Sequence, residues 1–206
     1  AKAVLIATGS DYKKLGIPGE MEFYGRGVHY CATCDGAFYR DKKLVVVGGG
    51  NSAIQEAIFL TRFASHIDLL VRSEIRASEI LQHELAKHAD KITVHLGTTT
   101  DEIVGEGNQV VKVIGTQGGI KTEFATDGVF VFIGLDPNTA FVKEFVTLDD
   151  YGLIKTDHNL MTSVTGVFAA GDVRSGATMQ IASAVGEGAT AALKIREFLE
   201  GKLHSA

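Results

Sequence analysis

Several features that would place this 206-residue chain in other classes of protein are scarce or missing. Two prolines are too few for a proline-rich linker, and two cysteines can form neither a framework of disulfides nor a structural zinc site. No apolar run approaches the roughly 18 residues that a membrane-spanning helix needs. The net charge is −5, with no basic tail or stripe. This charge pattern argues against electrostatic binding of nucleic acid.

Glycine, in contrast, is abundant: 24 of the 206 residues are glycine, against an average of about 7%. We interpret this excess as many tight turns and places where the backbone approaches another group closely. Hydrophobic residues make up 45% of the chain and charged residues 22%, as in globular proteins. The mean hydropathy of +0.13 suits a buried parallel sheet. The chain starts without Met, inside a strand-like segment that lacks the features of a signal peptide, so we expect a processed product or a fragment of a longer protein.

Hydrophobic periodicity predicts an α/β fold with a Rossmann-like, doubly wound parallel sheet. Continuous apolar runs predict strands at 44–47, 67–71 and 92–96. Helical spacing predicts amphipathic helices over 52–63 and 77–89, the second with Ile80, Leu81 and Leu85 on one side. Strands and helices that alternate in this way build a parallel sheet.

The pattern then changes to a β-meander and a second group of elements. We expect meander strands at 102–104, 109–115 and 120–125, and a return to the parallel sheet at 129–133. A loop is expected at 134–138. Further strands are expected at 3–6, 152–156 and 167–170, and a long C-terminal helix over 180–199. The apolar positions of that helix include residues 181, 185, 189, 192, 193 and 199.

A glycine motif lies directly between a predicted strand and a predicted helix. The residues are Gly48, Gly49, Gly50, Asn51, Ser52 and Ala53, which fit the dinucleotide pattern G-x-G-x-x-A/G. Gly48 would permit the sharp turn, Gly50 would let a pyrophosphate reach the backbone, and Ala53 would keep helix and strand close. The exposed N–H groups of the helix start would hold phosphates. An ordinary glycine-rich turn is the alternative.

The end of the next predicted strand bears on which nucleotide binds. An acidic residue there would bond the ribose 2′-OH of NAD, whereas arginine favours the 2′-phosphate of NADP. Arg72 occupies this position, and Arg76 could flank the same phosphate. Alternatively, both arginines are solvated surface residues. NAD also stays an alternative to NADP, because the acidic residue Glu74 lies nearby in the sequence.

Two further motifs carry candidate chemistry. Cys31 and Cys34 form a Cys-x-x-Cys pair, which near βαβ units is typical of a redox dithiol. Asp35 is a candidate proton donor or acceptor. The alternatives to a redox dithiol are a pair of incidental cysteines or half of a metal site. His29, two residues before Cys31, is interpreted as a loop histidine. Gly171 and Asp172 end an apolar strand, where an acid can accept hydrogen bonds from a ligand hydroxyl.

In combination, the motifs resemble the bacterial-type, low-molecular-weight thioredoxin reductases. The matching stretches are A-T-G at 7–9, C-A-T-C-D-G at 31–36, V-V-G-G-G-N-S-A at 46–53, I-G-L-D-P-N-T at 133–139 and G-V-F-A-A-G-D-V at 166–173. The resemblance implies an NAD(P)H-binding domain over 12–133, which carries the dithiol. It further implies that residues 1–11 and 134–206 are parts of an FAD domain. Nothing matches that family's first, FAD-pyrophosphate fingerprint, so FAD binding by this chain is in question.

The resemblance also implies roles for individual residues. Electrons would pass from NADPH through FAD to the dithiol and on to thioredoxin. Cys34 would face the flavin, Cys31 would attack the thioredoxin disulfide, and Asp35 would serve both thiols as acid and base. Cofactor contacts are implied for Ile133, Gly134, Gly171, Asp172, Gln180 and Ile181. The segments 11–14 and 134–137 would be hinges between the domains.

Several alternatives stay open. We expect a preference for NADPH over NADH. The family usually has one more arginine after the strand that ends at Val71, and its absence here weakens that expectation. The protein could also be a related flavoprotein that serves another partner, or a flavin-free nucleotide-binding module without turnover. A metal site is not expected, because the seven histidines show no metal-type spacing with the cysteines. The resemblance implies a cytoplasmic protein and a homodimer.

Overall fold

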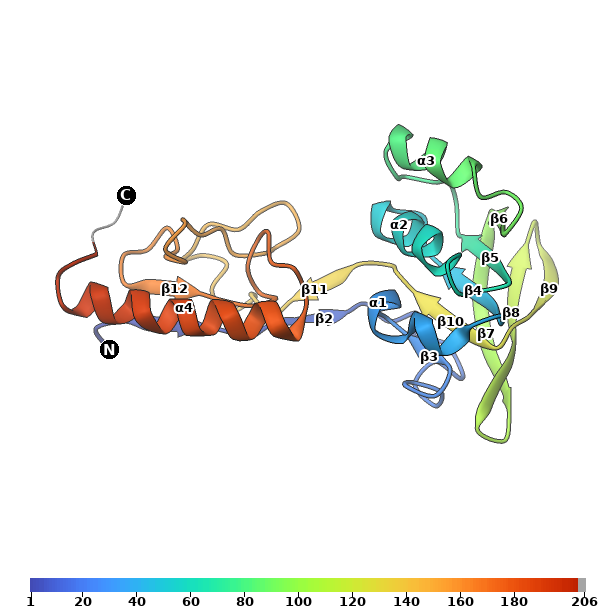
Figure 1. The fold of residues 1–206 in the computed structure, drawn as a ribbon, viewed down its shortest axis with the longest axis horizontal. Coiled ribbons are helices and arrows are strands. Elements are labelled where there is room, and N and C mark those ends of the chain that lie inside the picture. Colours follow the sequence, from blue (N-terminus) through green and yellow to red (C-terminus); the bar gives the residue numbers. More distant parts are fainter. Residues whose placement is uncertain (204–206) are drawn as a thin grey trace. The chain divides into compact units, whose positions relative to one another are not determined.

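The computed structural model describes residues 1–203, and the chain divides into two compact units (Figure 1). Unit 1 comprises Ala1–Asp11 and Leu135–Ala206, and unit 2 comprises Tyr12–Gly134. The chain therefore enters unit 2 once and leaves it once. Each unit is described by itself below.

A five-stranded parallel sheet forms the centre of unit 2. Its strands are β3 (Val28–His29), β10 (Gly128–Val131), β4 (Lys43–Val47), β5 (His66–Val71) and β6 (Ile92–Leu96), in that order across the sheet. Every neighbouring pair is parallel. This arrangement confirms the predicted Rossmann-like parallel sheet, although β10 ends two residues earlier than expected.

The two faces of the sheet are covered by different structures, which explains the continuous apolar runs. Helices α2 (Asn51–Leu60) and α3 (Glu79–Ala86) cover one face, and a β-meander covers the other (Figure 1). Along β4, Leu44 and Val46 pack with the helices, whereas Val45 and Val47 pack with the meander. A strand that is buried on both faces needs apolar residues at every position.

The meander consists of β7 (Thr98–Glu106), β8 (Gln109–Gln117) and β9 (Ile120–Ala125), all antiparallel. The predicted meander is confirmed, but β7 and β8 are longer than expected. The additional pairs, such as Thr98 with Gln117, are polar. Hydrophobic alternation does not predict these polar pairs, because backbone hydrogen bonds, and not apolar side chains, hold them in the sheet.

Helix α3 corrects one expected face. Leu85 is buried as predicted, but the side chain of Ile80 is 80% exposed. At 3.6 residues per turn, positions five apart point in directions that differ by about 140°. Ile80 and Leu85 therefore do not share a face, and Leu81 packs next to the core instead.

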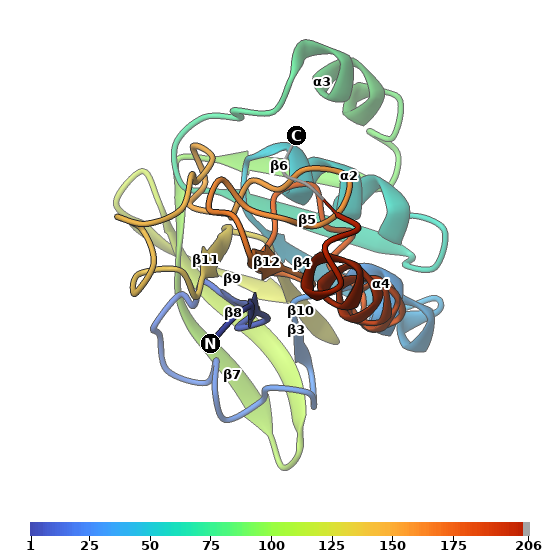
Figure 2. The same cartoon turned by 90° about the vertical axis from the view of Figure 1, so that its left-hand side faces the viewer.

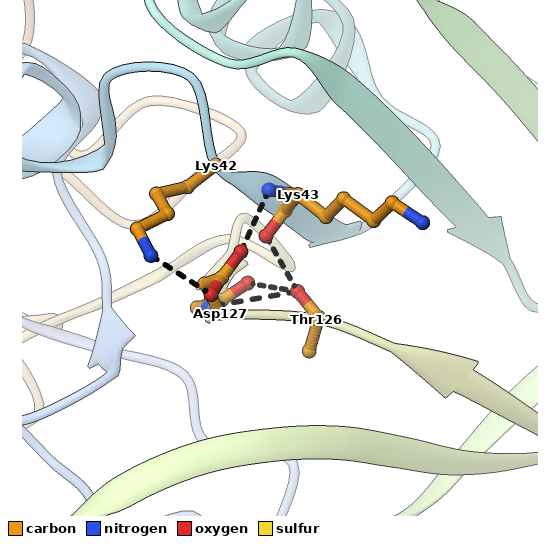
Figure 3. Close-up of polar contacts among 5 residues, drawn as sticks. Lys42, Lys43, Thr126 and Asp127 are labelled. Carbon is orange, nitrogen blue, oxygen red and sulfur yellow. Dashed lines mark hydrogen bonds and ion pairs between the residues drawn. The ribbon is translucent and has the colours of Figure 1, made fainter.

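A polar clamp joins the start of β4 to the turn before β10 (Figure 3). The Asp127 carboxylate accepts a 2.9 Å hydrogen bond from the backbone N–H of Lys43, and its other oxygen lies 3.4 Å from Lys42 Nζ. Thr126 Oγ1 lies 3.1 Å from the Lys43 carbonyl and 2.8 Å from the Gly128 carbonyl. These contacts fix the register of β4 against β10.

Unit 1 contains two small sheets and one long helix. Strand β1 (Val4–Ile6) pairs in parallel with β12 (Val167–Ala169), and β2 (Ser10–Tyr12) pairs with β11 (Leu135–Pro137). Helix α4 (Ile181–Leu199) runs beside β12 (Figure 2). The expected loop at 134–138 is therefore partly a strand. The strand expected at 152–156 is wrong, since only Ile154 forms isolated bridges there.

Helix α4 buries only part of its apolar surface. Ile181, Val185, Leu193 and Leu199 are all more than half exposed. The side that faces the rest of unit 1 instead carries Ala191, which is buried, and Phe198, whose ring contacts that of Phe168. Both sides of the helix are apolar, so spacing alone does not identify the packed one. None of the helices in the described part of the chain is long and apolar enough to cross a membrane.

Candidate functional site

The two cysteines form a disulfide on a short turn of unit 2. Cys31 and Cys34 are joined with an S–S distance of 2.10 Å around the start of α1 (Ala32–Asp35). Ala32 is buried in the core, whereas Cys34 is exposed and Cys31 is half-buried. A Cβ added at Gly36 would lie 2.8 Å from Leu60 Cδ2 of α2. The backbone after the disulfide therefore lies directly against α2, with the disulfide facing outward.

Asp35 stands at the end of a hydrogen-bonded chain of side chains. Its Oδ2 lies 3.2 Å from His29 Nδ1, and His29 Nε2 lies 2.7 Å from the Tyr39 hydroxyl. Burial lowers the pKa of His29, an effect that nearby Asp35 opposes, and burial raises the pKa of Tyr39 to about 12. The expectation of a loop histidine is therefore wrong. His29 lies in β3 and is buried, and the residue order contains no signal that pairs it with Asp35 and Tyr39.

The backbone just before the disulfide is anchored by a buried carboxylate. Glu20 is 1% exposed and accepts hydrogen bonds from the backbone N–H groups of Leu15 and Gly16, each at 2.8 Å. It also accepts a 2.7 Å hydrogen bond from the Tyr30 hydroxyl. Burial and the Glu20 carboxylate hold the pKa of Tyr30 well above its usual value. Lys14 Nζ lies 3.6 Å from the centre of the Tyr30 ring. Sequence reasoning assigned no role to Glu20 or Tyr30.

The glycine motif forms the turn between β4 and α2, and its glycines differ in what surrounds them. A Cβ at Gly48, where φ is +141°, would lie 2.3 Å from the Phe132 carbonyl oxygen and 2.8 Å from Ala53 Cβ. A Cβ at Gly49 would lie 2.7 Å from Val71 Cγ1. At Gly50, nothing lies within 4 Å of the Cβ position. Gly48 and Gly49 thus allow close packing, whereas Gly50 faces open space at the start of α2.

The loop that carries Arg72 and Arg76 folds back onto the glycine turn. The Arg76 backbone N–H donates to the Gly49 carbonyl at 2.7 Å. The Asn51 side chain accepts a 2.9 Å hydrogen bond from the Ser78 backbone N–H. Both arginine side chains are exposed, as are Asn51 and Ser52. The structure therefore brings the predicted phosphate-binding arginines and the glycine turn into one region of unit 2.

In unit 1, Gly171 and Asp172 follow β12. Asp172 Oδ1 is buried and has no hydrogen-bond partner. The Gly171 backbone N–H donates to the Glu187 carboxylate at 2.8 Å, and Arg174 forms an ion pair with the same carboxylate. The hydrogen bonds from Arg174 lower the pKa of Glu187. Sequence reasoning singled out Asp172 but assigned no role to Glu187, which fastens this loop to α4.

The remaining predicted cofactor residues lie at the ends of elements. Ile133 and Gly134 are exposed and follow β10, and the Gly134 carbonyl accepts a 3.1 Å hydrogen bond from the Lys13 backbone N–H. Gln180 is half-buried at the start of α4, and Ile181 is 86% exposed. Within residues 1–203, no group of three or more His, Cys, Asp or Glu side chains is arranged to hold a metal ion.

The unpaired buried oxygen of Asp172 bears on whether the chain can bind a flavin nucleotide. Such an atom is costly unless a donor reaches it. Asp172 Oδ1 would accept a hydrogen bond from a ligand hydroxyl, as FAD carries in its ribityl and ribose groups. The free acceptor at Asp172 therefore fits a hydroxyl of FAD, and the open space at Gly50 fits the pyrophosphate of a dinucleotide.

Fold and site together define a class: a Rossmann-like α/β protein with a glycine turn at its parallel sheet and a Cys-x-x-Cys disulfide. Comparison with known proteins specifies it further. Residues 1–188 match the model of the pyridine nucleotide-disulphide oxidoreductase family, and the chain belongs to that family.

Similar proteins carry the name thioredoxin reductase. The thioredoxin reductase of Bacillus subtilis is 44% identical over 203 residues, which are 97% of this chain and 64% of that protein. A 34.2 kDa protein in the rubredoxin operon of Clostridium pasteurianum is 43% identical over 204 residues, which are 98% of this chain and 66% of that protein. The chain thus spans about two thirds of the length of these relatives.

Solved structures agree with this assignment. The crystal structure of the Streptococcus pyogenes thioredoxin reductase is 44% identical and matches with a TM-score of 0.89, covering 97% of this chain and 66% of that one. The thioredoxin reductase of Giardia duodenalis matches at 35% identity with a TM-score of 0.90, covering 96% and 66%. These matches confirm the family and the fold that the motifs predicted.

Proposed function

We propose that this chain carries the pyridine-nucleotide site and the dithiol of a thioredoxin-disulfide reductase, together with part of its FAD site. The observation that carries the proposal is the Cys31–Cys34 disulfide, with Cys34 exposed, in the same unit as the β4–α2 glycine turn. The names of the similar proteins support thioredoxin as the protein partner.

For the nucleotide, the proposed contacts lie at the carboxyl end of β4. The first N–H groups of α2, which has no side-chain cap at Gly50, would hold the pyrophosphate in the open space beside Gly50. Gly48, Gly49 and Ala53 would keep helix and strand close enough for this. Arg72 and Arg76 would pair with the 2′-phosphate of NADPH.

For FAD, the proposed contacts in unit 1 centre on Asp172. Its unpaired Oδ1 would accept a hydrogen bond from a flavin-nucleotide hydroxyl. Gly171, Gln180 and Ile181 would lie along the same ligand, and Glu187 would hold the Gly171 loop in place through its hydrogen bond to the Gly171 N–H. Ile133 and Gly134 belong to unit 2, and their proposed cofactor contacts rest on the resemblance alone.

Bound NADPH and FAD would supply a path for two electrons to the Cys31–Cys34 disulfide. With both thiols free, the Cys31 thiolate attacks the disulfide of thioredoxin, and one thioredoxin sulfur leaves as a thiolate. Cys34 then attacks the mixed disulfide, which re-forms the Cys31–Cys34 bond and releases thioredoxin with two thiols. Asp35 moves protons to and from the cysteine sulfurs during these steps.

Nucleotide titration tests the first part of this proposal. The wild-type chain should bind NADPH at least tenfold more tightly than NADH, a difference of about 1.4 kcal/mol. Combined Arg72→Ala and Arg76→Ala substitutions should remove that difference by weakening only NADPH. Arg62→Ala, which removes another exposed arginine of unit 2, is the control and should change neither affinity. Equal wild-type affinities for the two nucleotides would contradict the assignment of the arginines.

The partner and the assembly are also part of the proposal. A disulfide reductase of the same family that serves another protein is the second candidate, and comparing thioredoxin with other disulfides as electron acceptors separates the two. A cytoplasmic location and a homodimer follow only from the resemblance. Analytical ultracentrifugation of the purified chain tests the dimer.

A further inference from the structure

The side chains that surround Asp35 include two that the proposed reaction does not use. His29, in β3, and Tyr39, in the 3₁₀ turn η1 (Gly36–Tyr39), form a hydrogen-bonded chain that ends on the Asp35 carboxylate. His29 is 8% exposed, so water competes little for its ring nitrogens. The three residues come from three different elements, and their meeting point is next to the disulfide in the sequence.

Packing fixes the two ring systems of this chain. The His29 ring lies 5.2 Å from the ring of Phe130 and 5.3 Å from that of Tyr39, measured between centroids. The Tyr39 ring lies over the backbone of Gly128, where an added Cβ would be 2.4 Å from Tyr39 Cε1. Neither ring can turn freely, because each is held between aromatic neighbours or against backbone.

The protonation states follow from the surroundings. The pKa of Tyr39, at about 12, keeps the phenol protonated at neutral pH, so its O–H donates to His29 Nε2. Burial lowers the pKa of His29 and favours the neutral imidazole. With Nε2 accepting, the single ring proton is on Nδ1 and is donated to Asp35 Oδ2. The titratable groups that face His29 are Asp35 and Tyr39, and the Asp127 charge also acts on Tyr39.

We propose that His29, held by Tyr39, is a positioning residue that orients the Asp35 carboxylate toward the Cys31–Cys34 pair. The proposal rests on the role of Asp35 in the proposed function and adds the residues that hold it in place. Asp35 is about one third exposed, so without a fixed donor its carboxylate would sample several rotamers. A proton donor or acceptor that is misdirected by even 1 Å loses much of its effect.

The test uses chemical reduction of the disulfide, which needs no nucleotide, flavin or thioredoxin. A dithiothreitol thiolate attacks one cysteine sulfur, the Cys31–Cys34 bond breaks, and the other cysteine leaves as a thiolate that takes up a proton. The second dithiothreitol thiol then closes its own ring and frees the second cysteine. Two electrons pass from dithiothreitol to the protein disulfide. The rate is followed by quenched alkylation and intact mass.

Four variants of the full chain distinguish positioning from a merely structural role. His29→Ala should slow the reduction about tenfold at pH 7, which is equivalent to about 1.4 kcal/mol in the barrier. His29→Asn, whose amide nitrogen can take the place of Nδ1, should retain a rate within about twofold of wild type. Tyr39→Phe should slow the reaction less than His29→Ala. His83→Ala, which removes an exposed histidine of α3, is the matched control and should have no effect.

A double-mutant cycle provides the decisive comparison. Added to Asp35→Asn, the His29→Ala substitution should slow the reaction by no more than about twofold, because its target is gone. Equal slowing by His29→Ala in both backgrounds would overturn the proposal, and so would a His29→Asn rate as low as that of His29→Ala. Circular dichroism confirms that each variant is folded. Failure of nucleotide or thioredoxin reactions would leave this result unaffected, so the two proposals fail separately.

Discussion

Replacing Gly50 by alanine separates a nucleotide site from an ordinary glycine turn. Gly50 has φ −89° and ψ 179°, a conformation that alanine adopts without strain, and no atom lies within 4 Å of its Cβ position. Alanine is the poorer residue at a helix N-cap, but it also lowers the entropy of the unfolded chain. These opposing effects leave the free energy of unfolding within about 1 kcal/mol of wild type.

Nucleotide binding should respond very differently to the same substitution. The added methyl group would occupy the space through which a pyrophosphate approaches the N–H groups of α2. We therefore expect Gly50→Ala to weaken NADPH binding at least tenfold, or by about 1.4 kcal/mol. Isothermal titration calorimetry measures the affinity, and thermal unfolding of the same sample measures the stability.

Gly48→Ala provides the contrast. Its φ of +141° and its 2.3 Å approach to the Phe132 carbonyl oxygen make alanine strained and overpacked. The cost should be about 2–6 kcal/mol, so this variant should lose stability as well as binding. Gly186→Ala, in open space on α4, is the control and should bind NADPH normally. If Gly50→Ala is stable and binds NADPH with wild-type affinity, the β4–α2 turn does not hold the pyrophosphate.

Three further substitutions test two hydrogen-bonded contacts near the site and one half-buried carboxylate of α2. Glu187→Gln should destabilise the chain by about 1–3 kcal/mol at pH 7. Because Arg174 lowers the pKa of Glu187, that difference should disappear as the pH falls through this pKa, and pH-independent melting curves would contradict it. Burial raises the pKa of Glu56, so stability is lost as the pH rises through that pKa. Glu56→Gln should therefore stabilise the chain at pH 7 but not near pH 4, and an unchanged Tm at pH 7 would refute this. Tyr30→Phe should cost about 1–2 kcal/mol in urea unfolding, because the buried Glu20 carboxylate loses one donor. No measurable cost would show that this hydrogen bond is not stabilising.

The sequence predicts the parallel sheet well because its strands are buried on both faces. Leu44–Val47 reads as a continuous apolar run for that reason, and the glycines after it mark the turn. The polar ends of β7 and the packed stripe of α4 could not be predicted. Backbone pairing determines the first, and the choice between two apolar sides of one helix determines the second.

The candidate site divides in the same way. Motifs with a fixed spacing, such as Cys31 with Cys34 and the glycines around Gly50, are visible in the sequence because their chemistry is local. The chain from Tyr39 through His29 to Asp35 is not visible, because it depends on how β3 and the turn η1 pack against each other. The bond between Glu187 and Gly171 likewise joins residues 16 positions apart through tertiary structure.

The central claim, that the Cys31–Cys34 pair passes electrons to thioredoxin, can be measured directly. The chain is reduced with dithiothreitol, desalted, and mixed anaerobically with oxidised thioredoxin, and the thiols of both proteins are counted by alkylation and mass spectrometry. We predict that one thioredoxin disulfide is reduced for each Cys31–Cys34 bond that re-forms, at least about 100-fold faster than glutathione disulfide reacts, and that Cys31→Ser abolishes this reaction. Reduction of thioredoxin no faster than of glutathione disulfide would contradict the account.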